Sequence, residues 1–312
     1  MSKYFRYGIA ILLSSLLSIT AYAEDVLRVG YQKSATALVL LKGEKRLENR
    51  LQPTGMAVKW VEFPGGPQLL EGLNVGAIDI GYTGETPPIF AQAAGADLVY
   101  IANDPASPSA EAILVTPDSP IRSVADLKGK RVALNKGSNV HYLLVRALEE
   151  AGLRYQDITP VYLAPADARA AFERGSVDAW VVWDPFAAAA ENQIHARVLR
   201  DGKGLAANYL FYLASRNFVS THPQAVTAFI EEIQHIDQEV KQDPERVARQ
   251  IAPLLGVSEE IARVVVGRQA YDINRVSSAV IEGQQQVADT FASLKLIPKP
   301  LDVKQAVWTP AQ

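Results

Sequence analysis

The sequence contains no cysteine, and this absence excludes several kinds of chemistry. Disulfide bonds, thiolate metal sites and cysteine nucleophiles all need a side chain that is not there. The four histidines are scattered without the i, i+4 spacing of a helical zinc site, so we expect no bound metal. A chain of 312 residues, 48% of them hydrophobic, is long enough to hold its fold by burying cores instead.

An excess of positive charge is missing as well. The chain has 31 Lys and Arg residues against 34 Asp and Glu, a formal net charge of −3, and no basic tract. Nucleic-acid binding depends on clustered positive charge that neutralises phosphates. We therefore expect no nucleic-acid partner.

The sequence also lacks the short motifs that mark common catalytic sites. It has no G-x-S-x-G nucleophile elbow, no P-loop, no H-E-x-x-H and no G-x-G-x-x-G fingerprint, so we expect no cofactor. Acid–base catalysis by Glu85, Asp184 and His141 remains open, because such catalysis needs only titratable groups within reach of one another. The missing motifs favour a protein that is not an enzyme.

Long apolar runs are missing except at the start of the chain. Residues 9–19 are apolar, follow the basic Lys3 and Arg6, and precede the small-x-small triplet at residues 21–23. The run is shorter than the roughly 20 residues that a membrane span needs. The pattern is typical of a cleaved signal peptide over residues 1–23, and we expect export to the periplasm.

The rest of the chain alternates short β-type runs with helical stretches, which predicts an α/β fold with parallel strands. The same order of strands and helices occurs twice, and a mostly helical region follows from residue 223. We expect two lobes, with residues 24–115 and 215–312 in lobe 1 and residues 116–214 in lobe 2. The chain would cross near residues 116–119 and return near residues 213–216, leaving a ligand cleft between the lobes.

One polar loop in the first half follows a predicted strand and opens a helix. This arrangement presents free backbone N–H groups and the positive end of the helix dipole to an anion. Within residues 82–88, Thr83 and Thr86 add hydroxyl donors and Gly84 permits close approach. Glu85 would repel an anion, so it either turns away or meets a cationic part of the ligand. An ordinary helix cap is the alternative interpretation.

The second half contains two further loops of this kind. Residues 134–141 include four candidate contacts: Gly137, Ser138, Asn139 and His141. Residues 183–186 begin with Trp183, whose ring could pack on an aliphatic ligand while its indole N–H donates a hydrogen bond. A structural histidine and a tryptophan that plugs the interface between lobes are the alternatives.

Several longer stretches resemble the aliphatic sulfonate-binding proteins of ABC importers. They are residues 63–74, 83–88, 133–141 and 175–180, and the similarity runs through the Trp-Asp-Pro turn at 183–185 to residues 297–300. The resemblance covers nearly the whole chain after residue 23. It implies a two-lobed periplasmic binding protein, type II-like, that closes on its ligand by a hinge motion.

The resemblance also implies a function in sulfur acquisition. The chain would bind alkanesulfonates and deliver them to an ABC permease at the inner membrane, and we expect a monomer. A sulfonate is ionised at every physiological pH and carries no proton, so a site made of donors suits it. The candidate ligand-binding residues are Gln32, Thr83, Gly84, Glu85, Thr86, Gly137, Ser138, Asn139, His141, Trp183 and Asp184.

The superfamily leaves other ligands open, because the fold alone does not choose among them. Taurine is one alternative, since Asp184 or Glu85 could pair with its ammonium group, and nitrate is another. An enzyme on the same fold is the third. Thiamine-pyrimidine synthases share this fold, but enzymes of that kind have a cysteine-rich loop. This chain has no cysteine, which counts against the enzyme alternative.

Overall fold

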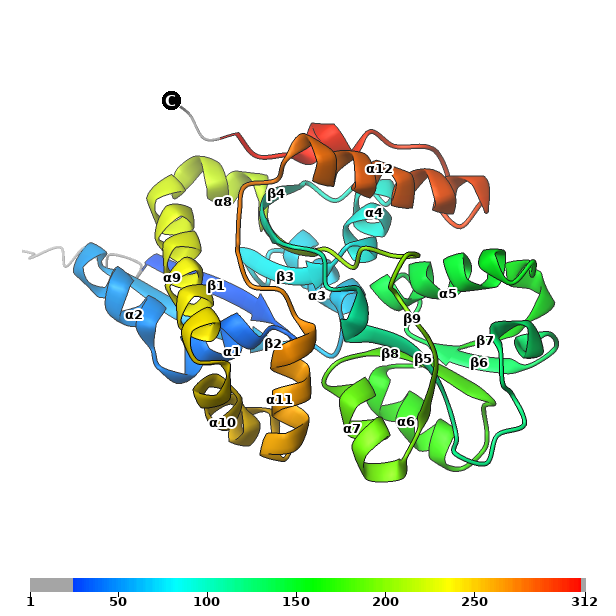
Figure 1. Ribbon diagram of the computed structural model, residues 1–312. Helices are drawn as coiled ribbons and strands as arrows, with labels where there is room; N and C mark the ends of the chain where they lie inside the picture. Colours follow the sequence, from blue (N-terminus) through cyan, green and yellow to red (C-terminus); the bar gives the residue numbers. More distant parts are fainter. Residues whose placement is uncertain (1–24, 310–312) are drawn as a thin grey trace, which may run out of the picture.

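The computed structural model describes residues 25–309, so the predicted signal peptide at residues 1–23 lies outside the described residues. The described part of the chain contains two five-stranded sheets with helices packed around them (Figure 1). The expected α/β fold with two halves is therefore confirmed at the level of the sheets.

The first sheet has the strand order β2-β1-β3-β10-β4. Its strands are β1 (Asp25–Tyr31), β2 (Met56–Glu62), β3 (Ile80–Gly84), β4 (Leu98–Asp104) and β10 (Leu210–Ser215). β1 runs parallel to β2 and β3, whereas β10 runs antiparallel to its neighbours β3 and β4.

The second sheet repeats this arrangement in the order β7-β6-β8-β5-β9. Its strands are β5 (Glu111–Val115), β6 (Arg131–Leu134), β7 (Thr159–Tyr162), β8 (Ala179–Trp183) and β9 (Arg197–Asp201). β5 takes the same place as β10 in the first sheet, antiparallel to both of its neighbours. Each sheet thus receives its antiparallel strand directly after the chain has crossed from the other half.

This exchange corrects the predicted crossing points. β5 belongs to the second sheet, so the chain crosses between Asp104 and Glu111 rather than near residues 116–119. It returns between Asp201 and Leu210 rather than near residues 213–216. Periodicity predicts that a segment is a strand, but not which sheet it joins.

Helices fill the connections and the C-terminal region. They are α1 (Thr36–Gly43), α2 (Arg46–Leu51), α3 (Gly66–Asn74), α4 (Thr86–Ala93), α5 (Asn139–Glu150), α6 (Pro165–Glu173), α7 (Phe186–Ile194), α8 (Arg216–Thr221), α9 (Pro223–Gln242), α10 (Pro244–Leu255), α11 (Glu259–Arg268) and α12 (Ser278–Ser293). Short 3-10 turns occupy Gln52–Thr54, Pro108–Ala110, Val124–Leu127, Tyr155–Asp157 and Val303–Ala306. α1 and α2 are separate helices, because Lys45 between them adopts a left-handed conformation with φ of 53°.

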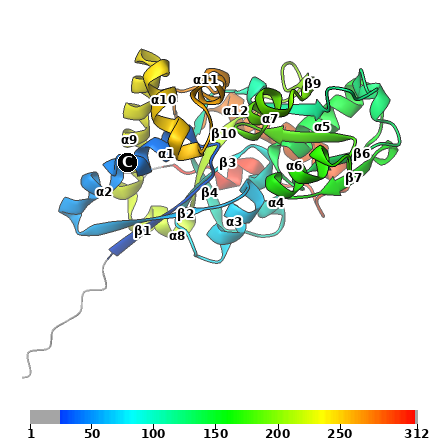
Figure 2. The same cartoon turned by 90° about the horizontal axis from the view of Figure 1, so that it is seen from below.

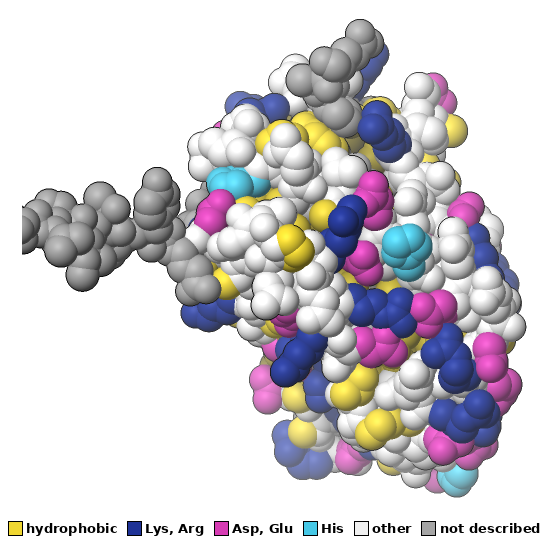
Figure 3. All heavy atoms as spheres, turned by 90° about the vertical axis from the view of Figure 1, so that its left-hand side faces the viewer, with side chains coloured by type: hydrophobic (Ala, Val, Ile, Leu, Met, Phe, Trp, Pro, Cys, Tyr) yellow, Lys and Arg dark blue, Asp and Glu magenta, His cyan; other side chains and the backbone are white. Residues whose placement is uncertain are grey.

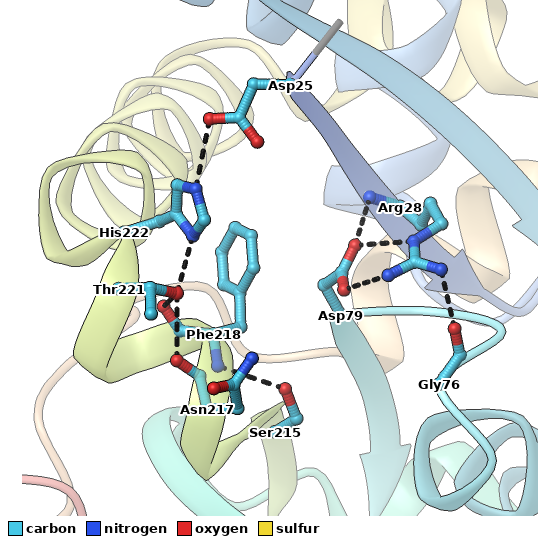
Figure 4. Close-up of polar contacts among 9 residues, drawn as sticks. All are labelled: Asp25, Arg28, Gly76, Asp79, Ser215, Asn217, Phe218, Thr221 and His222. Carbon is cyan, nitrogen blue, oxygen red and sulfur yellow. Dashed lines mark hydrogen bonds and ion pairs between the residues drawn. The ribbon is translucent and has the colours of Figure 1, made fainter. Parts of the chain in front are cut away.

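The two halves share an arginine–aspartate tie that the sequence analysis did not find. In the first half, the Arg28 side chain donates to Asp79 and to the carbonyl oxygen of Gly76, joining β1 to the turn before β3 (Figure 4). In the second half, Arg131 makes the same bonds to Asp178 and to the carbonyl oxygen of Gly175. The signal is a short G-x-[IV]-D repeat at residues 76–79 and 175–178.

The apolar cores do not follow the division into two sheets. One cluster lies within the first half, around β1, α1, α9 and α10. A second contains residues of both halves, such as Leu69 and Ile89 from the first and Val132 and Leu143 from the second. The halves lie side by side in Figure 2 and are joined by this common core.

The outer face of the first half carries interspersed charges of both signs, as Figure 3 shows. Ion pairs join α2 to α9 there, with Arg46 bound to Glu239 at 2.5 Å and Arg50 bound to Glu231 at 3.0 Å. Within residues 25–309, no helix is both long and apolar enough to cross a bilayer.

Candidate ligand-binding cleft

A cavity lies between the two sheets, near the carboxyl ends of β1, β3 and β8. It is lined by Gln32, Ser34, Gly66, Tyr82, Thr83, Gly84, Ala110, Asn139, Trp183, Asp184, Asn208, Leu210 and Gln269. The cavity has a volume of about 20 Å³, which is room for little more than one water molecule. A larger headgroup does not fit between its walls as they stand.

Thr83 contributes a hydroxyl group to this wall of the cavity, and its side chain is hidden from bulk solvent. It lies in β3, is fully buried, and its Oγ1 makes no hydrogen bond within the described residues. Gly66, the first residue of α3, faces it: a Cβ at this position would lie 2.0 Å from Thr83 Oγ1. The helix start at Gly66 and the hydroxyl of Thr83 thus meet at one wall of the cavity.

Gly84 and Asn139 bring the two halves close together at the cavity. A Cβ at Gly84 would lie 2.8 Å from the Cβ of Asn139, the first residue of α5. Asn139 Nδ2 is already engaged, since it donates to Glu111 Oε2 at 2.6 Å and to Asn208 Oδ1 at 3.1 Å. Asn139 lines the cavity, but its amide N–H groups are turned toward buried neighbours.

Glu85 turns away from this cavity. Its Oε2 accepts a hydrogen bond from the Tyr209 backbone N–H at 3.1 Å, and the residue lines a neighbouring cavity of about 310 Å³ with Tyr142 and Tyr209. Burial raises the pKa of Glu85 to about 7. Burial and, after it, the charge of Glu85 raise the pKa of Glu111 well above its usual range. Of the two alternatives given for Glu85, the side chain has the orientation that turns away from the cavity.

His141 is buried among aromatic rings instead of facing the cavity. Its ring lies 6.2 Å from that of Phe90 and 5.2 Å from that of Phe291, both from the first half. Its Nδ1 accepts a hydrogen bond from the Gly137 backbone N–H at 3.2 Å. Burial, with a smaller effect of the Lys136 charge, lowers the pKa of His141 to about 4, so the ring is neutral at pH 7.

The structure therefore brings together only part of the predicted set. Gln32, Thr83, Gly84, Asn139, Trp183 and Asp184 line the cavity. Glu85, Thr86, Gly137, Ser138 and His141 do not line it. Ser138, for example, donates its hydroxyl to the Asn135 carbonyl oxygen at 2.7 Å and stabilises its own turn.

Trp183 and Asp184 end β8 at the opposite wall. Trp183 packs edge-to-face on Phe186, with 6.3 Å between the ring centroids. Asp184 Oδ1 accepts the Ala188 backbone N–H at 2.9 Å in the first turn of α7, while its Oδ2 makes no hydrogen bond within the described residues. Burial raises the pKa of Asp184 to about 6 against the opposing effect of the Arg268 charge.

Some lining residues were missed by the sequence analysis. Gly66 had a detectable signal, because Gly65-Gly66-Pro67 follows a strand and opens a helix in the same way as the three loops considered. Asn208 and Gln269 lie in connecting segments without any motif. Only the tertiary fold brings them to the cavity, where Gln269 Nε2 donates to the Ser34 carbonyl oxygen at 2.7 Å.

Two α/β halves of the same strand order, joined by two crossings with a cavity between them, define the class of periplasmic binding proteins. The chain belongs to the NMT1/THI5-like family, whose model matches residues 52–247. It is 45% identical, over 98% of both chains, to the "Putative aliphatic sulfonates-binding protein" of Escherichia coli strain K12. The resemblance inferred from the sequence is thereby confirmed.

Solved structures agree with this assignment. The alkanesulfonate-binding protein SsuA of Xanthomonas axonopodis pv. citri, bound to MOPS, is 44% identical with a TM-score of 0.87, covering 91% of this chain and 98% of that one. The periplasmic aliphatic sulphonate binding protein SsuA of Escherichia coli is 45% identical with a TM-score of 0.82, covering 92% and 93%. The desulfurization enzyme DszB, at 16% identity and a TM-score of 0.66, shares the fold alone.

Proposed function

We propose that this chain is the periplasmic solute-binding component of an ABC importer for aliphatic sulfonates. The observation that carries the proposal is the cavity wall. There the hydroxyl of Thr83, which has no hydrogen-bond partner in the described part of the chain, meets the start of α3. Among residues 25–309, no Lys or Arg lines the cavity. Neutral donors and a helix terminus suit an anion that is ionised at every physiological pH.

The relatives support the same ligand class. The similar proteins of Escherichia coli and Xanthomonas are named for aliphatic sulfonates and alkanesulfonates, and the Xanthomonas structure holds MOPS, which is itself a sulfonate. In this proposal residues 1–23 direct export, the mature monomer binds its ligand in the periplasm, and a membrane permease receives the loaded protein. The two halves act as lobes that move about the crossings at residues 105–110 and 202–209.

A taurine-like aminosulfonate is the second candidate, and a specific observation favours it. Asp184 Oδ2 is buried at the cavity and has no hydrogen-bond partner within the described residues. A free carboxylate oxygen can accept a hydrogen bond from an ammonium group placed next to the sulfonate. An alkanesulfonate would leave this acceptor unpaired.

Calorimetric titration of the mature protein tests the proposal. Ethanesulfonate and MOPS should bind, whereas sulfate and nitrate should not compete at similar concentrations. Thermal denaturation gives an independent measurement, because a ligand at 100 times its Kd stabilises the folded protein by about 2.7 kcal/mol. Taurine binding more than tenfold tighter than ethanesulfonate would replace the alkanesulfonate assignment, and no binding of any sulfonate would refute it.

A further inference from the structure

Helices α7 and α11 come from different halves but lie side by side, as the views in Figures 1 and 2 agree. Ile261 and Val265 of α11 pack against Ala188 and Ala189 of α7 in a small buried cluster. This contact is separate from the core that α4, α5 and α12 share. The packing of α7 against α11 is therefore a second apolar contact between the two halves.

An ion-pair cluster continues this contact toward the cavity. Arg268, the last residue of α11, donates to both carboxylate oxygens of Glu191, at 2.7 Å and 2.9 Å. Its Nη1 also lies 3.4 Å from Asp184 Oδ1. One cation of the first half thus faces two carboxylates of the second half, and three-quarters of the Arg268 side chain is shielded, with 25% exposed.

Both ends of this cluster are adjacent to the ligand cavity. Asp184 lines the cavity itself, and Gln269, which follows Arg268 in the chain, lines it from the first half. Without the guanidinium, the two carboxylates near the cavity would act against an anion already held there. The same guanidinium bonds to the opposite half only while the halves are together.

We propose that Arg268 is a positioning residue that couples closure of the two halves to anion binding. It would hold α7 against α11 in the closed molecule and offset the negative charge of Asp184 and Glu191. The inference rests on the proposed function, because it assumes that the ligand is an anion captured between the halves.

The first test separates the dissociation rate from the association rate by stopped-flow fluorescence with MOPS. Arg268→Gln should raise the dissociation rate about tenfold with an association rate within roughly twofold, since the bonds form after capture. Arg268→Lys should recover part of the loss by keeping the charge. Arg268→Gln combined with Glu191→Gln should be no worse than Arg268→Gln alone.

Arg263→Gln is the matched control. Arg263 also lies on α11, but its ion pairs are with Glu245 and Glu259 of the same half. It should leave both rates unchanged. An equal rise of the dissociation rate in both variants, or no rise in Arg268→Gln, would overturn the inference.

A ligand-independent measurement distinguishes this inference from the proposed function. Because the chain has no cysteine, Asn49→Cys and Arg174→Cys introduce unique labelling sites on the two halves. Spin-label distances should shift toward longer values when Arg268→Gln is added. If the unsubstituted protein binds no sulfonate, the proposed function fails while the distances still decide the role of Arg268. Identical distance distributions with and without Arg268→Gln, in every condition, would refute that role.

Discussion

Thr83 and Thr86 are identical side chains with different surroundings. Both hydroxyl groups are buried and make no hydrogen bond within the described residues, but only Thr83 lines the cavity. A buried hydroxyl without a partner is costly to the fold, so its retention at the cavity fits a ligand contact. Residue identity alone could not separate the two positions.

Replacing Thr83 by valine should weaken sulfonate binding with little effect on stability. The substitution keeps the shape and removes a donor, and a hydrogen bond to a charged group contributes about 1.5–3 kcal/mol. We expect a Kd increase of roughly tenfold to a hundredfold by calorimetry, with the melting temperature of the free protein unchanged or raised. Thr86→Val is the control and should bind normally, and a matching loss there would place the ligand elsewhere.

The raised pKa of Glu85 predicts that the folded protein becomes less stable as the pH rises, whereas a carboxylate with a lowered pKa has the opposite effect. Burial raises its pKa in the folded protein from the usual 4.5 to about 7, so the folded state holds the proton longer. The contribution of protonated Glu85 to the stability of the folded protein is complete below about pH 4.5 and is lost as the pH rises through 7. Glu85→Gln should remove this decline, which is on the order of a few kcal/mol.

Denaturant unfolding at several pH values measures the effect. The stability of the unsubstituted protein relative to Glu85→Gln should fall between pH 4.5 and pH 7. Glu71→Gln, at an exposed position on α3, serves as the control and should leave the profile unchanged. Parallel profiles for the unsubstituted protein and Glu85→Gln would contradict the prediction.

At the scale of helices and strands, sequence patterns predicted most elements but not their partners. The apolar run at residues 112–115 predicts a strand, but the sheet it joins depends on pairing with β8 and β9, which is not encoded locally. Proline usually interrupts a helix, but Pro253 lies inside α10, which ends at Leu255. The three polar loops were recognised because each follows a strand, but the direction of Glu85 and His141 depends on contacts from distant segments.

The contact between the end of β3 and the start of α5 gives a prediction at this scale. Gly84→Ala would place a Cβ 2.8 Å from Asn139 Cβ, and neither atom is the flexible end of a side chain. The halves should then be unable to meet fully, so sulfonate affinity should fall by tenfold or more. Gly267→Ala, where no atom of the residues that the structure describes lies within 4 Å of the added Cβ, should bind normally in the same calorimetric assay. Unchanged affinity in Gly84→Ala would show that this contact is not part of the bound state.

For the whole molecule, the two sheets do not correspond to two independent cores. Phe291 of α12, in the first half, packs against Phe90 of its own half and against His141 of the second half. These three rings lie where the two halves meet. Phe172, by contrast, packs inside the second half against Trp180, at a centroid distance of 5.9 Å. In the proposed function, opening of the halves at the cavity would have to separate or deform the packing of α5 against α4 and α12.

This shared core predicts that the ligand-free protein unfolds in one cooperative transition. Phe291→Ala and Phe172→Ala each remove a fully buried ring and should cost roughly 3–5 kcal/mol. If the halves form one unit, both substitutions lower the temperature of the same single calorimetric peak, and its calorimetric and van't Hoff enthalpies agree. If the halves were independent, Phe172→Ala would shift only one of two peaks. Two peaks in the unsubstituted protein would therefore contradict the view that one apolar core spans both halves.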